Sequence, residues 1–195
     1  MKIKKLISAL VLGSMLVGLS GCNITDFSAE NLLRPPKAVG DEAEIEQLIA
    51  KTADSGYTLK YPKNGKFRSA IIMTDLDGND SNEAVAFFRN SAETSSVHML
   101  VMYSKDNSWE IASDNIFETT DIDSVDFADL TGNGKAEIIV NSTTYTPNVG
   151  KLSCYSYSEG KTNEVGSGQS CSSFVTGDFD NRSEEHTSEL QSRLH

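Results

Sequence analysis

Two acidic segments carry oxygen-bearing side chains at alternate positions, which is the spacing that a cation-binding loop uses. They are Asp75-Leu-Asp-Gly-Asn-Asp-Ser-Asn-Glu83 and Asp129-Leu-Thr-Gly-Asn-Gly-Lys-Ala-Glu137, and each lies between two apolar runs. A hard cation such as Ca²⁺ takes about six to eight oxygen ligands from carboxylates, amides, hydroxyls and backbone carbonyls. The chemistry that this spacing indicates is therefore calcium binding.

Each loop offers ligands at its first, third, fifth, seventh and ninth positions. In the first loop these are Asp75, Asp77, Asn79, the carbonyl of Ser81 and Glu83. In the second loop they are Asp129, Thr131, Asn133, the carbonyl of Lys135 and Glu137. Because the neutral hydroxyl of Thr131 replaces a carboxylate, we expect the second site to be weaker. The alternative is a polar turn without metal, since Asp, Asn and Gly favour turns by themselves.

The loops differ from an EF-hand, which needs Gly at its sixth position and Glu at its twelfth. Counted from Asp75, these positions hold Asp80 and Ala86. The flanking runs also have the length and bounding residues of strands rather than helices. We therefore expect a calcium loop between two strands, in which the ion has a structural and not a catalytic role.

Short strands must position these loops. Apolar runs bounded by Asn, Ser, Asp or Gly recur along residues 57–181, as antiparallel strands do. The first series covers residues 69–74, 83–89, 96–104 and 108–117. The second covers 124–129, 136–145, 151–159 and about 162–166, and a third series starts at 172–178. The leading residues Asp75, Asp129 and Asp178 recur at about fifty residues, a period typical of propeller blades with four strands each.

The predicted fold class is therefore all-β. We expect an incomplete β-propeller with about two four-stranded antiparallel blades and the start of a third, preceded by one short helix. The repeated unit, an apolar strand followed by D-x-[D/T]-G-N-x-x-x-[D/E] and another apolar strand, resembles the FG-GAP/VCBS-type repeat of integrin-like propellers and bacterial surface proteins. The resemblance covers about residues 65–181, with a third motif truncated at Asp178-Phe-Asp-Asn181. It implies a binding or adhesion role toward a protein or a glycan.

Residues 1–21 have the layout of a secretory signal peptide, with a lysine-rich head, a short apolar core and small residues at the end. The ending Leu19-Ser-Gly-Cys22 resembles the bacterial lipobox. This resemblance implies that Cys22 is acylated and becomes the first mature residue, so that lipid anchors the protein to the membrane. The expected location is extracytoplasmic, at the bacterial cell membrane. The alternative is an ordinary signal peptide with a chance cysteine.

Two segments lie between the signal peptide and the β domain. Residues 22–40 include Pro35-Pro36 and no periodic pattern, which predicts a flexible tether. Residues 41–56 predict a short helix, with Asp41 and Glu44 placed as in a capping box and Ile45, Leu48 and Ile49 on one apolar face. Gly56 is expected to end this helix.

Residues 182–195 differ from the chain before them. The run Arg182-Ser-Glu-Glu-His-Thr-Ser-Glu-Leu-Gln-Ser192 resembles a translated reading frame of a common DNA-sequencing adapter. We therefore expect this segment to be an artefact without a strand pattern, and the natural protein to continue differently after Asn181. His186 and His195 accordingly receive no chemical role, which leaves His98, expected to be a packed or surface strand residue.

Charge and cysteine content limit the function classes. The formal charge is −11, which repels nucleic acid, so no nucleic-acid partner is expected. Cys154 and Cys171 remain after Cys22, and the sequence leaves open whether they form a disulfide or stay as free thiols. No zincin, nucleophile-elbow, P-loop or CxxC motif is present. We expect a non-enzymatic binding module; the alternatives are a surface hydrolase or lyase whose catalytic part is missing, and a structural envelope module.

Overall fold

The computed structural model describes residues 40–54, 56–93, 95–143, 146, 149–177 and 189–193. Cys22 with its lipobox, the tether before residue 40 and the third acidic motif at Asp178 lie outside the described residues. The account below concerns the unit that begins at Ala38.

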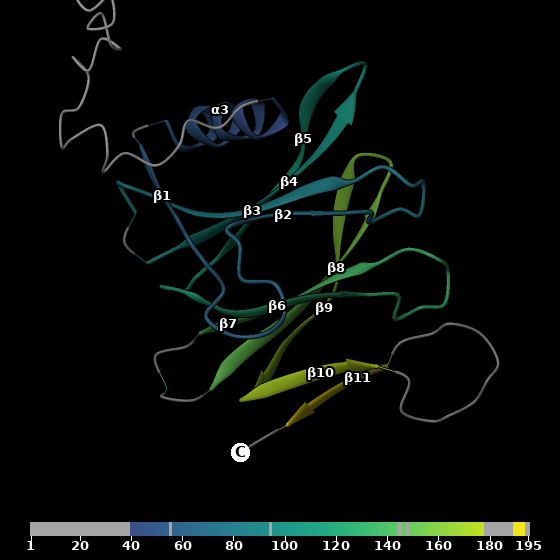
Figure 1. Cartoon of the computed structure of the whole chain (residues 1–195). Coiled ribbons are helices and arrows are strands. Elements are labelled where there is room, and N and C mark those ends of the chain that lie inside the picture. The colour runs from purple at the N-terminus through teal and green to yellow at the C-terminus, as the bar shows by residue number, and fades with distance from the viewer. Residues whose placement is uncertain are drawn as a thin grey trace, which may run out of the picture. The chain divides into compact units, whose positions relative to one another are not determined.

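The first sheet contains five strands and carries one helix. Helix α3 (Asp41–Ala53) precedes β1 (Tyr57–Leu59), β2 (Ile71–Thr74), β3 (Glu83–Asn90), β4 (Val97–Lys105) and β5 (Ser108–Phe117). The strand order is β1-β3-β4-β5, and β2 also pairs with β3, so that β2 to β5 form an antiparallel meander. Figure 1 shows α3 lying against one face of this sheet.

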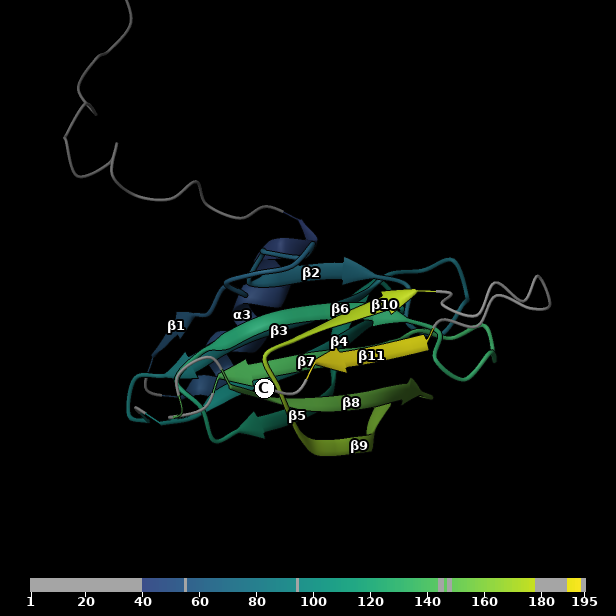
Figure 2. The same cartoon turned by 90° about the horizontal axis from the view of Figure 1, so that it is seen from below.

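The second sheet repeats the meander with β6 (Ile122–Ala128), β7 (Glu137–Thr143), β8 (Gly150–Ser158) and β9 (Lys161–Cys171) in sequential order. After it, β10 (Ser173–Gly177) pairs with β11 (Glu189–Arg193) in a separate two-stranded sheet. Strand β10 also lies beside β6, as Figure 2 shows from below. All pairs are antiparallel, which confirms the all-β, antiparallel part of the predicted fold class.

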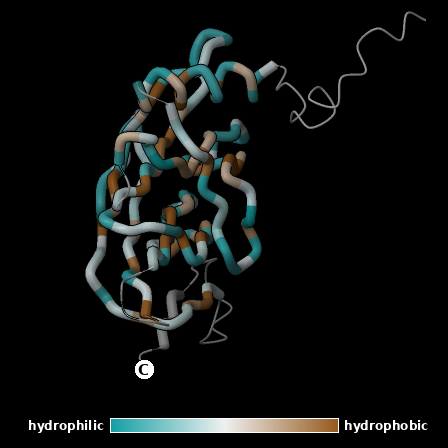
Figure 3. The backbone as a smooth tube through the Cα atoms, turned by 90° about the vertical axis from the view of Figure 1, so that its left-hand side faces the viewer, coloured by the Kyte–Doolittle hydropathy of each residue, from teal (hydrophilic) through white to brown (hydrophobic). Residues whose placement is uncertain are grey.

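Alternation of side chains along the strands divides the core into three layers. On β3, Val85 and Phe87 face the second sheet, whereas Ala86 and Phe88 face α3. Such alternation follows from the two-residue period of a strand. Figure 3 shows the hydropathy of each residue along the backbone, with hydrophobic segments (brown) gathered mainly inside the unit and hydrophilic ones (teal) mainly along its outer bends.

The layer between the two sheets is the largest of the three. It takes Val85, Phe87, Val97, Met99 and Val101 from the first sheet and Ile122, Val125, Ile138, Val140 and Tyr155 from the second, among others. A second layer joins α3 to the first sheet through Ile45, Ile49, Ala84, Ala86, Phe88, Leu100, Met102 and Trp109. A third layer on the far face of the second sheet contains Ala128, Ile139, Leu152, Cys154 and Cys171, with Leu130 and Phe174 packed against it.

Several local predictions were wrong. The capping box does not form, because the N-cap is Gly40 without a side-chain hydrogen bond, and Glu44 instead accepts a hydrogen bond from Trp109 N at 3.3 Å. The helix ends at Ala53, with Asp54 at its C-cap. Strand β9 is longer than the expected strand near residues 162–166, and β11 lies in the segment that was expected to have no strand.

The two cysteines are free and buried, which is the thiol alternative of the sequence prediction. The register places Cys154 opposite Gly166, and Cys171 opposite Gly150, four positions from Cys154 on β8. At about 3.3 Å per residue this separates the pair by about 13 Å. A disulfide needs Cα atoms within about 7 Å, so the register does not permit one.

Candidate metal centre in the paired acidic loops

The two acidic loops have the same backbone hydrogen bonds, shifted by 54 residues (129 − 75). In the first loop the carboxylate of Asp75 accepts hydrogen bonds from the N–H groups of Gly78 at 2.8 Å, Asn79 at 3.3 Å and Asp80 at 2.8 Å. In the second loop Asp129 accepts from the corresponding N–H groups of residues 132–134 at 2.7, 3.1 and 2.7 Å. A leading aspartate therefore folds each loop around its own side chain.

These hydrogen bonds set the charge state of the leading aspartates. Slight burial acts to raise the pKa of Asp75, but the N–H groups of Asp80, Gly78 and Asn79 outweigh it and lower the pKa below its ordinary value. The pKa of Asp129 is lowered in the same way, with burial again opposing the backbone N–H groups. Both residues are thus held as carboxylates, the form that binds a cation.

The first loop brings three carboxylates together. Oxygen atoms of Asp75, Asp77 and Glu83 all lie within 4.8 Å of one another. Glu83 is only 3% exposed, and it accepts a hydrogen bond from Leu76 N at 2.8 Å. Burial, followed by the negative charges of Asp77 and Asp75, raises the pKa of Glu83. The three side chains could hold a cation, and without one their charges repel.

One oxygen of the Asp77 carboxylate lacks a hydrogen-bond partner. Its Oδ1 atom is buried and has no hydrogen-bond partner among the described residues. Tyr157 lies close by: burial, then the charges of Glu83 and Asp77, raise the pKa of its hydroxyl to about 12. The cluster therefore lies near a phenol that stays neutral, and it contains one carboxylate oxygen that no described residue satisfies.

The second loop satisfies its groups internally. Thr131 stands where the first loop has Asp77, and its hydroxyl donates to Glu137 Oε1 at 3.4 Å. The other oxygen of Glu137 accepts from Leu130 N at 2.7 Å, which repeats the contact between Leu76 and Glu83. With only two carboxylates and a hydroxyl donor, this loop has less need of a cation than the first.

The remaining predicted ligands serve the turns. The side-chain oxygen of Asn79 accepts from Ser81 N at 2.7 Å, and Asn133 accepts from Lys135 N at 2.8 Å. The structure therefore gathers Asp75, Asp77 and Glu83, whereas the asparagines in the fifth position are directed to their own backbones.

The two loops also contact each other, which the sequence did not predict. Ala136 N donates to the carbonyl of Leu76 at 3.0 Å. A side chain at Gly78 would place its Cβ atom 2.7 Å from the carbonyl oxygen of Gly134. The loops are thus part of the junction between the two sheets.

Sequence reasoning missed Tyr157 as a neighbour of the acidic cluster. The residue lies in β8 of the second sheet. Its proximity to Glu83 depends on how the two sheets pack, so no local signal could have found it.

His98 is packed in a strand, as predicted. It is 4% exposed, its Nδ1 lies 2.9 Å from Asp114 Oδ1, and its ring stacks on Phe88 with centroids 4.8 Å apart. Its second ring nitrogen, Nε2, lies 3.5 Å from Glu93 Oε2. Both ring nitrogens therefore have carboxylate partners.

Compared with protein-family models, curated proteins and solved structures, the chain matches none of them. Among the described residues, no helix is both long and apolar enough to cross a membrane.

Proposed function

We propose that this chain is a calcium-stabilised binding module of the bacterial cell surface, built from propeller-type blade repeats and anchored by lipid on Cys22. Its ligand is a protein or a glycan. The observation that carries the calcium proposal is the cluster of Asp75, Asp77 and Glu83, in which a buried carboxylate oxygen has no partner. The repeat proposal is supported by two meanders whose acidic loops share their hydrogen bonds.

The geometry fits a calcium ion. Two oxygens bound to the same Ca²⁺ at about 2.3–2.6 Å lie at most about 5 Å apart, and the three carboxylates lie within 4.8 Å. A bound cation would neutralise the charges of Asp77 and Asp75, which add to the effect of burial in raising the pKa of Glu83, and it would give Asp77 Oδ1 a partner. Because the loop joins β2 to β3 and contacts the second sheet, the ion would stabilise the junction between the repeats.

We propose binding rather than catalysis because the described part of the chain offers no exposed acid–base pair with histidine. His98 is buried and hydrogen-bonded to Asp114. The anchored, acidic module also suits an extracytoplasmic surface, where an acidic protein gains solubility and attracts cations.

Isothermal titration of Ca²⁺ into the full chain, solubilised in detergent, tests the calcium proposal. We expect a saturable heat and an increase in the melting temperature at millimolar Ca²⁺, since a ligand that binds only the folded state stabilises it. An absence of both effects would overturn the proposal. The binding proposal is tested separately on a glycan array and by pull-down with extracellular matrix proteins, with and without a chelator.

A further inference from the structure

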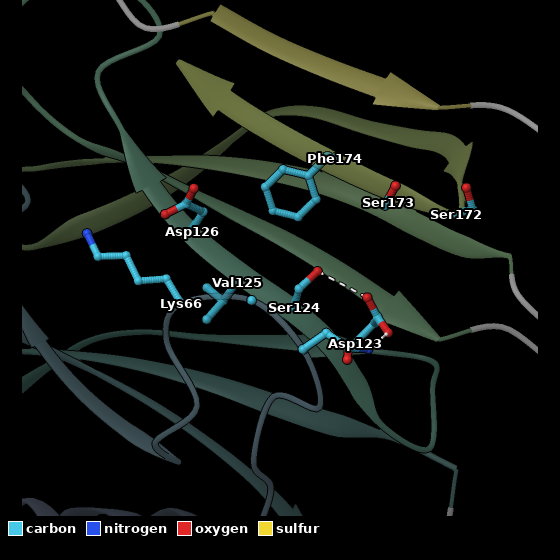
Figure 4. Close-up of a pocket in the computed structure, with 10 residues that line it drawn as sticks. Lys66, Asp123, Ser124, Val125, Asp126, Ser172, Ser173 and Phe174 are labelled. Carbon is cyan, nitrogen blue, oxygen red and sulfur yellow. Dashed lines mark hydrogen bonds between the residues drawn. The ribbon is translucent and has the colours of Figure 1, made fainter.

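A cavity of about 240 Å³ opens where three segments distant in the sequence meet (Figure 4). One wall is the turn before β2, another is β6, and the third is the start of β10. The lining residues are Asn64, Gly65, Lys66, Asp123, Ser124, Val125, Asp126, Ser172, Ser173 and Phe174. The volume lies below the range of about 300–1,000 Å³ typical of drug-sized ligands, so the cavity fits one small ring.

The walls are fixed by hydrogen bonds before any ligand arrives. The side chain of Asn64 donates to Asp123 Oδ1 at 2.8 Å, and its backbone N–H donates to the Asp123 carbonyl at 2.7 Å. On the opposite wall, the hydroxyl of Thr176 on β10 donates to Asp126 Oδ2. The turn and β10 are thereby attached to the same strand, β6, and a preformed cavity reduces the entropy lost on binding.

The cavity offers both acceptors and donors. Asp123 accepts from neutral donors, the amides of Asn64 and Asn141 and the hydroxyl of Ser124 at 3.1 Å, and Asp126 accepts from Phe127 N at 3.0 Å. Lys66 also lines the cavity, but its ammonium group lies 5.0 Å from the centre of the Phe67 ring. Figure 4 shows the ring of Phe174 between Asp126 and Ser173. The cavity therefore combines carboxylates, hydroxyls and an amide with one aromatic ring.

This combination selects against charged ligands. An anion would meet the carboxylates of Asp123 and Asp126, and a metal cation would find both carboxylates already accepting hydrogen bonds from the protein. A neutral polyhydroxylated ring avoids both conflicts, because each hydroxyl group can donate to a remaining carboxylate lone pair and accept from a hydroxyl or an amide. Its C–H face can pack on the ring of Phe174.

We propose that this cavity binds a single neutral sugar ring, such as a terminal residue of a cell-surface glycan. The inference rests on the proposed binding function and selects the glycan over the protein ligand. It assigns Asp123 and Asp126 as acceptors for sugar hydroxyls and Phe174 as the packing surface.

Saturation-transfer NMR with the full chain tests this assignment. The probes are the methyl glycosides of glucose, galactose, mannose and N-acetylglucosamine at millimolar concentration, with inorganic phosphate and tetramethylammonium as charged competitors. We expect at least one glycoside to bind and neither competitor to displace it. Phe174→Ala and Asp126→Asn should each weaken this binding about tenfold, while Tyr61→Ala and Asp106→Asn, which change exposed residues outside the cavity, should leave it unaltered.

The outcomes separate this inference from the proposed function. If no glycoside binds, if a charged competitor occupies the cavity, or if both cavity variants bind the glycoside as the natural chain does, the cavity assignment is wrong. Asp126→Asn preserves side-chain volume, so it remains decisive if Phe174→Ala fails to fold. If both cavity variants still bind on the glycan array, the cavity assignment is wrong and the proposed surface binding stands. If Ca²⁺ titration shows no binding but the glycoside still binds, only the calcium proposal is wrong.

Discussion

At the scale of single residues, one exchange separates the two acidic loops. Their backbones fold alike around Asp75 and Asp129. Asp77 adds a third charge to the first loop, whereas Thr131 donates a hydrogen bond to Glu137 in the second. The same backbone can therefore take two forms. With Asp at the third position it presents mutually repelling carboxylates that need a cation, and with Thr there it forms a turn in which this side chain donates a hydrogen bond to the glutamate.

The variant Asp77→Thr gives the first loop the residue that the second loop carries. We expect the calcium-induced rise in melting temperature to be largely lost, because one of three carboxylates is removed. In chelator, the variant should melt at the same temperature as the natural chain or above it, since repulsion with Glu83 and a buried unsatisfied oxygen both disappear. Differential scanning calorimetry with Ca²⁺ and with chelator measures both effects.

The opposite exchange, Thr131→Asp, is the matched control. It should lower the melting temperature in chelator and increase the response to calcium. If Asp77→Thr instead lowers the chelator melting temperature and leaves the calcium response unchanged, Asp77 is not a ligand.

Stability should depend on pH in two windows of opposite sign. The pKa of Glu83 is raised above 4.5, so its folded state binds the proton more tightly, and stability increases as pH falls toward 4.5 in chelator. The pKa values of Asp75 and Asp129 are lowered below 3.8, so their contribution is present above that pH and is lost as pH falls further. Urea unfolding at a series of pH values measures the profile.

Glu83→Gln isolates the upper window. Because glutamine does not titrate, the variant should lack the increase in stability that the natural chain shows as the pH falls toward 4.5. It should keep the loss at lower pH that Asp75 and Asp129 cause. Parallel profiles for the two proteins would contradict the raised pKa of Glu83.

At the scale of elements, the first acidic loop is attached to the second sheet through its backbone. Leu76 accepts from Ala136 N, and Gly78 approaches Gly134 so closely that no Cβ atom fits. The loop between β2 and β3 therefore forms part of the contact between the two meanders.

Two glycines provide a matched pair of substitutions for this contact. Gly78 and Gly134 both have positive φ, at 75° and 80°, so alanine costs about 1–2 kcal/mol at either position. Only Gly78 has a backbone oxygen within 2.7 Å of the added atom. We expect Gly78→Ala to destabilise the protein by about 3 kcal/mol and Gly134→Ala by about 1 kcal/mol, measured by urea unfolding. Equal costs would mean that the loop contact does not form in solution.

Most strands could be predicted from the sequence because their side chains alternate between two apolar layers. The predicted run 108–117 coincides with β5, and 83–89 lies within β3. Strand β9 was underestimated because most of its residues are exposed and polar, so no hydrophobic period marks it. The three-residue β1 was missed because it is held by pairing with the distant end of β3 and not by a local pattern.

The candidate site was only partly predictable for a related reason. The order of Asp75, Asp77 and Glu83 along one loop is local, so their meeting could be predicted from spacing. The cavity depends on Asn64, Asp126 and Phe174, which belong to three segments brought together by sheet packing. Spacing along a chain contains no information about such contacts.

At the scale of the whole molecule, the two sheets share a single buried layer. A substitution in the second sheet should therefore destabilise the first. Ile138 on β7 is fully buried in this layer, and replacing it with alanine should cost about 2–5 kcal/mol. Trp109, the only tryptophan, lies in the first sheet. Its fluorescence measures whether the first sheet unfolds at a lower urea concentration in the variant.

Val165→Ala is the control for this prediction. Val165 is 57% exposed on β9, so its loss should change the unfolding free energy by no more than about 0.5 kcal/mol. If Ile138→Ala shifts the circular dichroism of the strands but leaves the Trp109 transition in place, the two sheets unfold independently.

Helix α3 covers one outer face of the two packed sheets. Its residues Ile45 and Ile49 occupy the face of the first sheet that points away from the second. A further meander cannot pack on that face as the second sheet packs on the other, because its side chains would meet a rod instead of a pleated surface. A further meander could therefore repeat the packing between the two sheets only on the far face of the second sheet. A closed ring of meanders would need one sheet contact, at α3, that differs from all the others.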